Sequence, residues 1–213
     1  MRNQTVNNRK CPRCGSSDTA EILRGMPAFT EELVQAIDDH RIILGGCCIS
    51  ENDPEAHCNA CGKDFGKPPY VRRHRGQTDD EPRELYPDVI TGITFSEGGY
   101  FNGHDQVEIV TEDGKRKSTY VHYPDLSEPY VKEISNAQWK RLMDTLFNRL
   151  CIHEWKKKYV NFSVLDGTQW ELGLKLTGGR HYNIYGSNDF PPLYKDLVRA
   201  FKPFMNKAKD ENS

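Results

Sequence analysis

The chain has 213 residues, with 29 lysines and arginines against 31 aspartates and glutamates. This balance creates no protein-wide field that would attract nucleic acid or an anionic membrane, so any such contact has to be local. No apolar run approaches the roughly 20 residues that span a bilayer, and the N-terminus lacks the apolar core of a secretory signal, so we expect a cytoplasmic protein without a membrane partner. In that reducing compartment, clustered cysteines indicate metal ligands sooner than disulfides.

Two short motifs of the same pattern frame the first segment of the chain: Cys11-Pro-Arg-Cys14-Gly15 and Cys58-Asn-Ala-Cys61-Gly62. A Cys-x-x-Cys turn brings two sulfurs to one ion, and the following glycine permits a sharp turn whose N–H groups point at the thiolates. A redox-active pair is the competing interpretation, but it requires a β-α-β context that the sequence does not show. We therefore predict one structural Zn²⁺ ion, with the four ligands Cys11, Cys14, Cys58 and Cys61.

One helix is predicted between the two motifs. Thr30 can cap its N-terminus, Glu31 and Glu32 complement the helix dipole, and Phe29 and Val34 occupy the positions of a hydrophobic staple. This inserted helix accounts for the long spacing between the two cysteine pairs. A module of this size buries too little apolar surface to be stable without a staple such as a metal ion.

The order of these features resembles a group of small bacterial zinc-ribbon proteins whose role is uncharacterised. The resemblance covers about residues 10–66, and the motifs that carry it are Cys11-Pro-x-Cys14-Gly-Ser, Ile43-Leu-Gly-Gly-Cys47 and Cys58-x-x-Cys61-Gly-x-x-Phe65. It implies a zinc ribbon with an inserted helix and no established activity. Metal ligation carries over to the four paired cysteines alone.

Cys47 and Cys48 lie outside the two motifs. They follow an apolar stretch, and free cysteine is among the most buried residue types, so we expect both to pack in the core. Two alternatives stay open. Either cysteine could bind a second metal together with His57, or one of them could be a reactive thiol.

The composition changes after residue 66, which divides the chain. Residues 1–66 form the predicted zinc-ribbon module, and residues 67–88 combine prolines with charge blocks of opposite sign and predict a linker. A second domain follows over residues 89–205, and residues 206–213 form a polar tail.

A short basic run in the predicted linker is a candidate nucleic-acid site. Cations bind phosphates while a base stacks on an aromatic ring, so the candidate residues are Tyr70, Arg72, Arg73 and Arg75. The competing interpretation is solvated surface, which is the commoner role of so short a run.

The second domain shows strands followed by a helix, twice. The predicted strands are residues 89–95, 106–112, 115–123, 159–164, 170–176 and 181–185, and the predicted helices start at residues 135 and 194. Ser135 and Gln138 have the spacing of a capping box, and Pro203 is expected to end the second helix. This order predicts an α+β domain with an antiparallel sheet and both helices on one face, and it suggests a strand-strand-strand-helix duplication.

No catalytic motif is present: the chain has no phosphate-binding glycine loop, no Gly-x-Ser-x-Gly and no His-Glu-x-x-His. His104, His122 and His181 lie on or near predicted strands, but the sequence brings none of them to a nucleophile. We therefore expect a non-enzymatic zinc-binding interaction protein that presents a surface to another protein or to nucleic acid. The alternative is an enzyme with an unrecognised active site in the second domain, in which the zinc module recognises the substrate.

Overall fold

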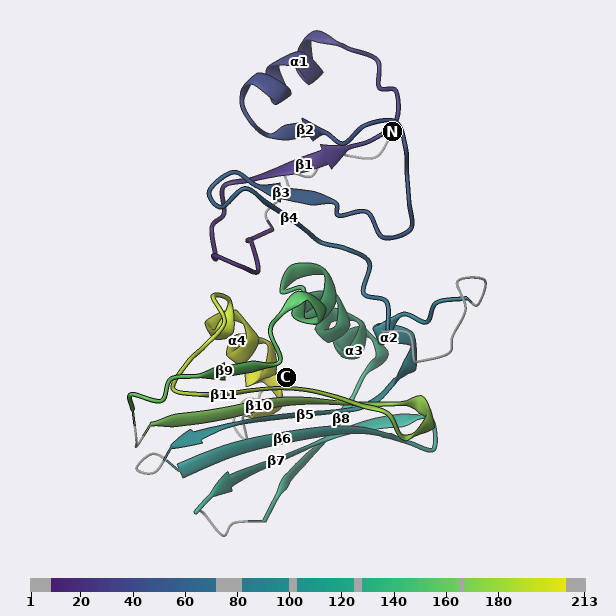
Figure 1. Ribbon diagram of the computed structural model, residues 1–213. Coiled ribbons are helices and arrows are strands. Elements are labelled where there is room, and N and C mark those ends of the chain that lie inside the picture. Colours follow the sequence, from purple (N-terminus) through teal and green to yellow (C-terminus); the bar gives the residue numbers. More distant parts are fainter. Residues whose placement is uncertain (1–8, 72–81, 100–102, 125–127, 165–166, 206–213) are drawn as a thin grey trace, which may run out of the picture.

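The computed structural model describes residues 9–71, 82–99, 103–124, 128–164 and 167–205. Its strands form two sheets, and the helices α3 and α4 lie between them (Figure 1). The prediction of an α+β architecture is confirmed. Within the described ranges, no helix combines the length and the apolar character needed to cross a bilayer.

The small sheet has four strands in the order β2-β1-β3-β4. Its strands are β1 (Thr19–Leu23), β2 (Ile42–Leu44), β3 (Ala56–Cys58) and β4 (Lys63–Phe65). The helix predicted between the cysteine motifs is α1 (Glu31–Asp38), where the Thr30 side chain accepts a hydrogen bond from Leu33 N at 3.3 Å. Because β2 runs parallel to β1, these two strands and α1 form a β-α-β crossover that the sequence analysis did not expect.

Helix α1 buries little of its surface. Ala36 is the buried residue of this helix. Phe29 and Val34, at the two staple positions, are 65% and 45% exposed. The small sheet therefore carries a helix with a largely open surface and a small core beneath it.

The prediction that Cys47 and Cys48 pack in the core is wrong, because both are exposed. Strand β2 ends at Leu44, and Gly46 then takes a left-handed φ of 83°. This conformation suits glycine and turns the chain away from the sheet, so the two cysteines lie in the loop that follows.

The large sheet has seven strands in the order β8-β7-β6-β5-β10-β11-β9. They are β5 (Ile90–Gly99), β6 (Gly103–Glu112), β7 (Lys115–Tyr123), β8 (Tyr130–Ile134), β9 (Lys158–Val160), β10 (Thr168–Leu176) and β11 (His181–Ser187). All neighbouring strands are antiparallel except β9 and β11, which pair in parallel. The sheet is thus antiparallel apart from one edge.

Helices α3 (Asn136–Met143) and α4 (Tyr194–Met205) cover one face of the large sheet (Figure 1). The predicted capping box begins α3, since Ser135 N donates to Gln138 Oε1 at 2.9 Å and Gln138 N donates to Ser135 Oγ at 3.2 Å. A π-helical turn (Asp144–Arg149) extends α3, and short 3-10 turns follow at Ile152–Glu154 and Thr177–Gly179. Another short helix, α2 (Tyr86–Val89), precedes β5.

The main core lies between the large sheet and these two helices. Phe95 on β5 stacks on Phe201 of α4 with ring centroids 4.7 Å apart. Fully buried aliphatic residues surround this pair, among them Ile93, Val107, Leu172, Ile184 and Leu197. Burial of this apolar surface holds the helices on the sheet.

Two predictions for the second domain are corrected. Pro203 does not end the last helix, which continues to Met205 because Phe204 is buried in the core and holds the final turn. The suggested duplication is not reflected in the topology. The first unit is a four-stranded meander that includes β8, whereas the second places β9 at the sheet edge in parallel with β11.

The predicted division into module, linker, domain and tail stays a prediction. Residues 72–81 of the linker and the tail, 206–213, lie outside the described residues. Where the structure describes the linker, its ends are packed, since Val71 and Tyr86 belong to the main core.

Candidate metal centre

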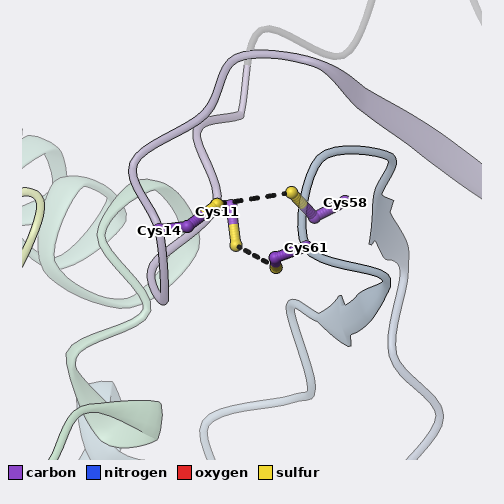
Figure 2. A group of neighbouring side chains, drawn as sticks. All are labelled: Cys11, Cys14, Cys58 and Cys61. Atoms are coloured by element: carbon purple, nitrogen blue, oxygen red, sulfur yellow. Dashed lines mark hydrogen bonds between the residues drawn. The ribbon is translucent and has the colours of Figure 1, made fainter.

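The four cysteines of the two motifs come together in space, as Figure 2 shows. Their sulfur atoms all lie within 4.8 Å of one another. Cys11 Sγ is 3.8 Å from Cys61 Sγ, and Cys14 Sγ is 3.6 Å from Cys58 Sγ. In the part of the chain that the structure describes, no other group of three or more His, Cys, Asp or Glu side chains has a spacing suited to a metal ion.

Strand pairing explains how two distant motifs meet. The second motif is the turn between β3 and β4, and Cys58 pairs with Thr19 at the start of β1, directly after the first motif. Each motif closes on itself through a 2.8 Å backbone bond, from Gly15 N to Cys11 O and from Gly62 N to Cys58 O. Both glycines have a left-handed φ, which accounts for glycine at this position.

Two of the sulfur–sulfur distances have the length of an edge of a tetrahedral metal site. With metal–sulfur bonds of about 2.3 Å, the edges of a thiolate tetrahedron measure about 3.8 Å. The two short distances in Figure 2, at 3.6 and 3.8 Å, match this value. Four cysteine ligands form a soft donor set, which suits zinc or iron in a sulfur-rich site.

Burial keeps two of the four thiols protonated in the absence of a cation. Cys11 and Cys58 are fully buried, and this burial raises the pKa of Cys11 to about 12 and the pKa of Cys58 above its usual range. At the exposed edge, a hydrogen bond from the Ser16 backbone lowers the pKa of Cys14. A divalent cation would displace the protons of the buried thiols and compensate the thiolate charges.

A residue far along the chain completes the wall of the site. Cys151 is 1% exposed and packs in one buried cluster with Cys11, Ala56, Cys58 and Phe65. Phe65 follows the second motif closely, whereas a lone cysteine outside both motifs carries no sequence signal for this place. Burial raises the pKa of the Cys151 thiol to about 12, so it is an inert, protonated neighbour of the ligands.

Hydrogen bonds connect the segment after the second motif to residues in the second half of the chain. Glu154 Oε1 accepts hydrogen bonds from the backbone N–H groups of Gly66 and Lys67 at 2.8 and 2.9 Å. His153 Nε2 donates to the Lys67 carbonyl at 2.8 Å, and burial lowers the pKa of this histidine. These contacts tie the strand end behind the site to the turn that follows α3.

Two competing interpretations, a redox-active pair and a second metal site with His57, are not supported by the geometry, whereas a reactive thiol at Cys47 or Cys48 stays a prediction. The β-α-β unit does not turn the pairs into a redox motif, because neither pair lies at the N-terminus of α1. His57 Nδ1 lies 2.6 Å from Asp64 Oδ1 on the neighbouring strand. It forms no metal-ligand group with Cys47 or Cys48 among the described residues.

The candidate nucleic-acid site is described in part. Tyr70 is half-buried, and the Arg83 guanidinium lies over its ring at 4.3 Å from the centroid. Arg72, Arg73 and Arg75 lie outside the described residues. The basic patch therefore stays a prediction.

The histidines of the second domain do not cluster with one another. His122 Nδ1 lies 2.8 Å from Asp105 Oδ1, which also accepts a hydrogen bond from Tyr120 OH at 2.6 Å. Both the His122 and the Asp105 side chains are half-exposed. His104 pairs across the sheet with Tyr123, and His181 is exposed on β11.

Comparison with known proteins gives one partial match. A stretch of 132 residues, 60% of the chain, is 25% identical to part of the 2-oxoglutarate dehydrogenase E1 component of Haemophilus influenzae (strain ATCC 51907 / DSM 11121 / KW20 / Rd). The match spans 13% of the length of that protein and does not establish a family. No family model matches the chain, and no solved structure gives a significant match.

Proposed function

We propose that this chain is a non-enzymatic zinc-binding interaction protein, whose metal centre holds a surface in shape for another protein or for nucleic acid. The observation that carries the proposal is the set of four cysteine sulfurs, all within 4.8 Å of one another, with Cys11 and Cys58 fully buried. All four coordination positions of a Zn²⁺ ion would be filled by protein. Such a site has no open position for water or substrate, so its role is structural.

The small core explains why a structural ion would be needed. The small sheet buries few apolar side chains, and α1 buries one. Structural zinc contributes on the order of 10 to 16 kcal/mol in small zinc-finger peptides, which exceeds what so small a core supplies. The ligands and the small sheet would then form one folding unit, in keeping with the zinc ribbon that the sequence resembles.

Exposed apolar side chains around the small sheet support a binding role. Met26, Phe29 and Ile49 are 92%, 65% and 74% exposed. Gly25 N donates to Gly46 O at 2.9 Å and joins the two loops that carry Met26 and Ile49. Exposed apolar surface of this kind commonly marks an interaction site.

The test begins with metal analysis of the purified full chain. We expect one zinc per chain, lost in Cys11→Ser and Cys58→Ser and kept in the matched controls Cys47→Ser and Cys48→Ser. The second arm is a pull-down from a lysate of the native host, with the zinc-loaded chain against a chelated sample. Absence of zinc, or failure of the loaded chain to retain any protein or nucleic acid, would count against the proposal.

A second candidate is an enzyme with its active site in the second domain. The observation in its favour is the Asp105–His122 pair, because a carboxylate that accepts the Nδ1 proton leaves Nε2 as the basic nitrogen. Hydrolysis of p-nitrophenyl acetate or p-nitrophenyl phosphate that is lost in His122→Ala and kept in His181→Ala would favour this candidate over the first.

A further inference from the structure

A groove of about 980 Å³ lies between α3, its π-helical extension and α4. The residues that line it include five cations against two carboxylates, Asp144 and Asp196. The cations are Arg9, Lys10, Arg141, Arg149 and Arg199. They come from both halves of the molecule, since Arg9 and Lys10 precede the first cysteine motif.

Four of the five cations form ion pairs, and the positive charge in excess comes from Arg141 and from the sharing of Asp196 by two cations. Arg9 binds Glu55, outside the groove, at 2.6 Å. Asp196 binds both Lys10, at 3.1 Å, and Arg199, at 2.7 Å. Asp144 lies 3.4 Å from Arg149. Arg141 makes no ion pair with any residue that the structure describes.

The floor of the groove is apolar and its rim is basic. Leu142 and Leu193 line it and are each 3% exposed, so they form the floor. The Arg149 and Arg199 side chains are 73% and 67% exposed, so they stand at the rim. An apolar floor with a charged rim is the usual anatomy of a docking surface for a protein segment.

Helix α1 has the complementary character. Residues 26–40 contain four carboxylates and neither lysine nor arginine, and Asp39, at the C-terminal end, is paired with Arg41 at 3.0 Å. Glu31 and Glu32 are exposed in the first turn of the helix, beside the exposed Phe29 and Val34. This acidic, apolar surface has no covering element among the described residues.

We propose that the groove of one copy of this chain binds α1 of a second copy. The carboxylates of α1 would face the arginines of the rim, and Phe29 would lie on the apolar floor. With about 1.5 Å of rise per residue, α1 is about 12 Å long, and the stretch from Gln138 to Arg149 is on the order of 15 Å, so the helix fits the length of the groove.

Within one chain the two surfaces cannot meet. Figure 1 shows α1 on the side of the small sheet that faces away from α3 and α4. The contact joins two different surfaces, so it is head-to-tail. If each of two copies binds α1 of the other, the two contacts form a closed dimer. If they do not, successive copies add to an open assembly.

The test is sedimentation velocity on the purified, metal-loaded full chain over a range of concentrations. One short helix buries a small interface, so we expect a dissociation constant of roughly 10 to 100 µM. Raising NaCl from about 0.05 to about 0.5 M should weaken the association, because exposed charges are screened. A chain that stays monomeric across this range overturns the proposal.

Charge reversal identifies the two surfaces. Arg141→Glu with Arg199→Glu reverses the groove, and Glu31→Lys with Glu32→Lys reverses α1. Each double variant should associate at least about tenfold more weakly than the parent, because like charges then face each other. An equimolar mixture of the two should regain association, since each supplies the surface that the other lacks.

Lys195→Glu with Lys202→Glu is the matched control, because both lysines are exposed on α4 and do not line the groove. Equal weakening in this control, or a mixture that does not regain association, overturns the proposal. The proposal is also overturned if the groove variant weakens the association and the α1 variant does not, because the groove would then bind another acidic ligand. Phe29→Ser removes an apolar contact without reversing a charge and should also weaken the association. Metal content and thermal unfolding are measured for every variant to verify that it is folded. The purified chain is tested alone, so failure here leaves the proposed function untouched.

Discussion

The Glu154 carboxylate accepts a hydrogen bond from the backbone N–H of Gly66 at 2.8 Å and so joins the end of the small sheet to the turn after α3. The same oxygen accepts from Lys67 N, and the Glu154 side chain is 10% exposed. One largely buried carboxylate thus accepts from two backbone donors next to the cluster of four cysteines. The metal centre and the helices of the large sheet are joined through this residue.

Replacing Glu154 by alanine should destabilise the protein. The buried Gly66 N–H would lose its acceptor, and an unsatisfied buried polar group costs about 1 to 3 kcal/mol, whereas the exposed Lys67 N–H can bind water instead. Glu154→Gln keeps an acceptor oxygen and should cost less. Urea unfolding of the metal-loaded chain measures both, with the exposed Glu51→Ala as control. Equal stability of Glu154→Ala and the parent would show that this contact does not hold the two halves together.

Thiol reactivity should separate the cysteines into groups. Cys47 and Cys48 are exposed and outside the metal centre, so they should react with iodoacetamide within minutes at neutral pH. The four ligands should react after chelation, and Cys151 after unfolding. Mass spectrometry of tryptic peptides measures the extent of alkylation at each cysteine. Rapid labelling of Cys11 or Cys58 in the metal-loaded protein would contradict the assignment of the ligands.

The pKa of Cys151 predicts a pH dependence at the alkaline end. Burial raises this pKa from 9.0 to about 12, so the folded state keeps the proton while the unfolded state loses it. The contribution of Cys151 to stability is therefore complete below pH 9 and declines as pH rises toward 12. The free energy of unfolding of the parent should fall more steeply between about pH 9 and 11 than that of Cys151→Ala. Parallel slopes in the two proteins would refute this assignment.

The sequence predicted the cluster of four cysteines because they come in two local turns, in which the spacing of Cys11 and Cys14 and the glycine that follows define the geometry. The β6-β7 hairpin was predictable for the same reason, since the turn at Asp113-Gly114 fixes the register and β7 has the expected bounds. Features that depend on contacts between distant segments have no such local motif in the sequence.

Contacts between distant segments explain what the sequence could not provide. The place of Cys151 beside the ligands depends on how the turn after α3 meets the small sheet. The exposure of Cys47 depends on the left-handed Gly46, whereas the tendency of cysteine to be buried is an average over many environments. The sequence predicted a strand over residues 159–164, but β9 has three residues, Lys158–Val160, which are the ones that pair with β11.

Removal of the metal should unfold residues 10–66 and leave the large sheet folded. The small sheet has little core besides the ligand cluster, whereas the large sheet has its own core around Phe95 and Phe201. Hydrogen exchange after chelation should therefore show loss of protection in β1 to β4 and retained protection in β5, β6 and β10.

The contacts of Glu154 and Cys151 indicate how far the unfolding should extend beyond the small sheet. Both residues lose their partners when the small sheet unfolds, so protection should also fall at residues 150–155, while the N-terminal half of α3, capped by Ser135, stays protected. Restoring zinc should restore both regions together. Collapse of both sheets on chelation, or a protected small sheet in metal-free protein, would overturn the view that the ion stabilises one half of the chain and anchors it to the other.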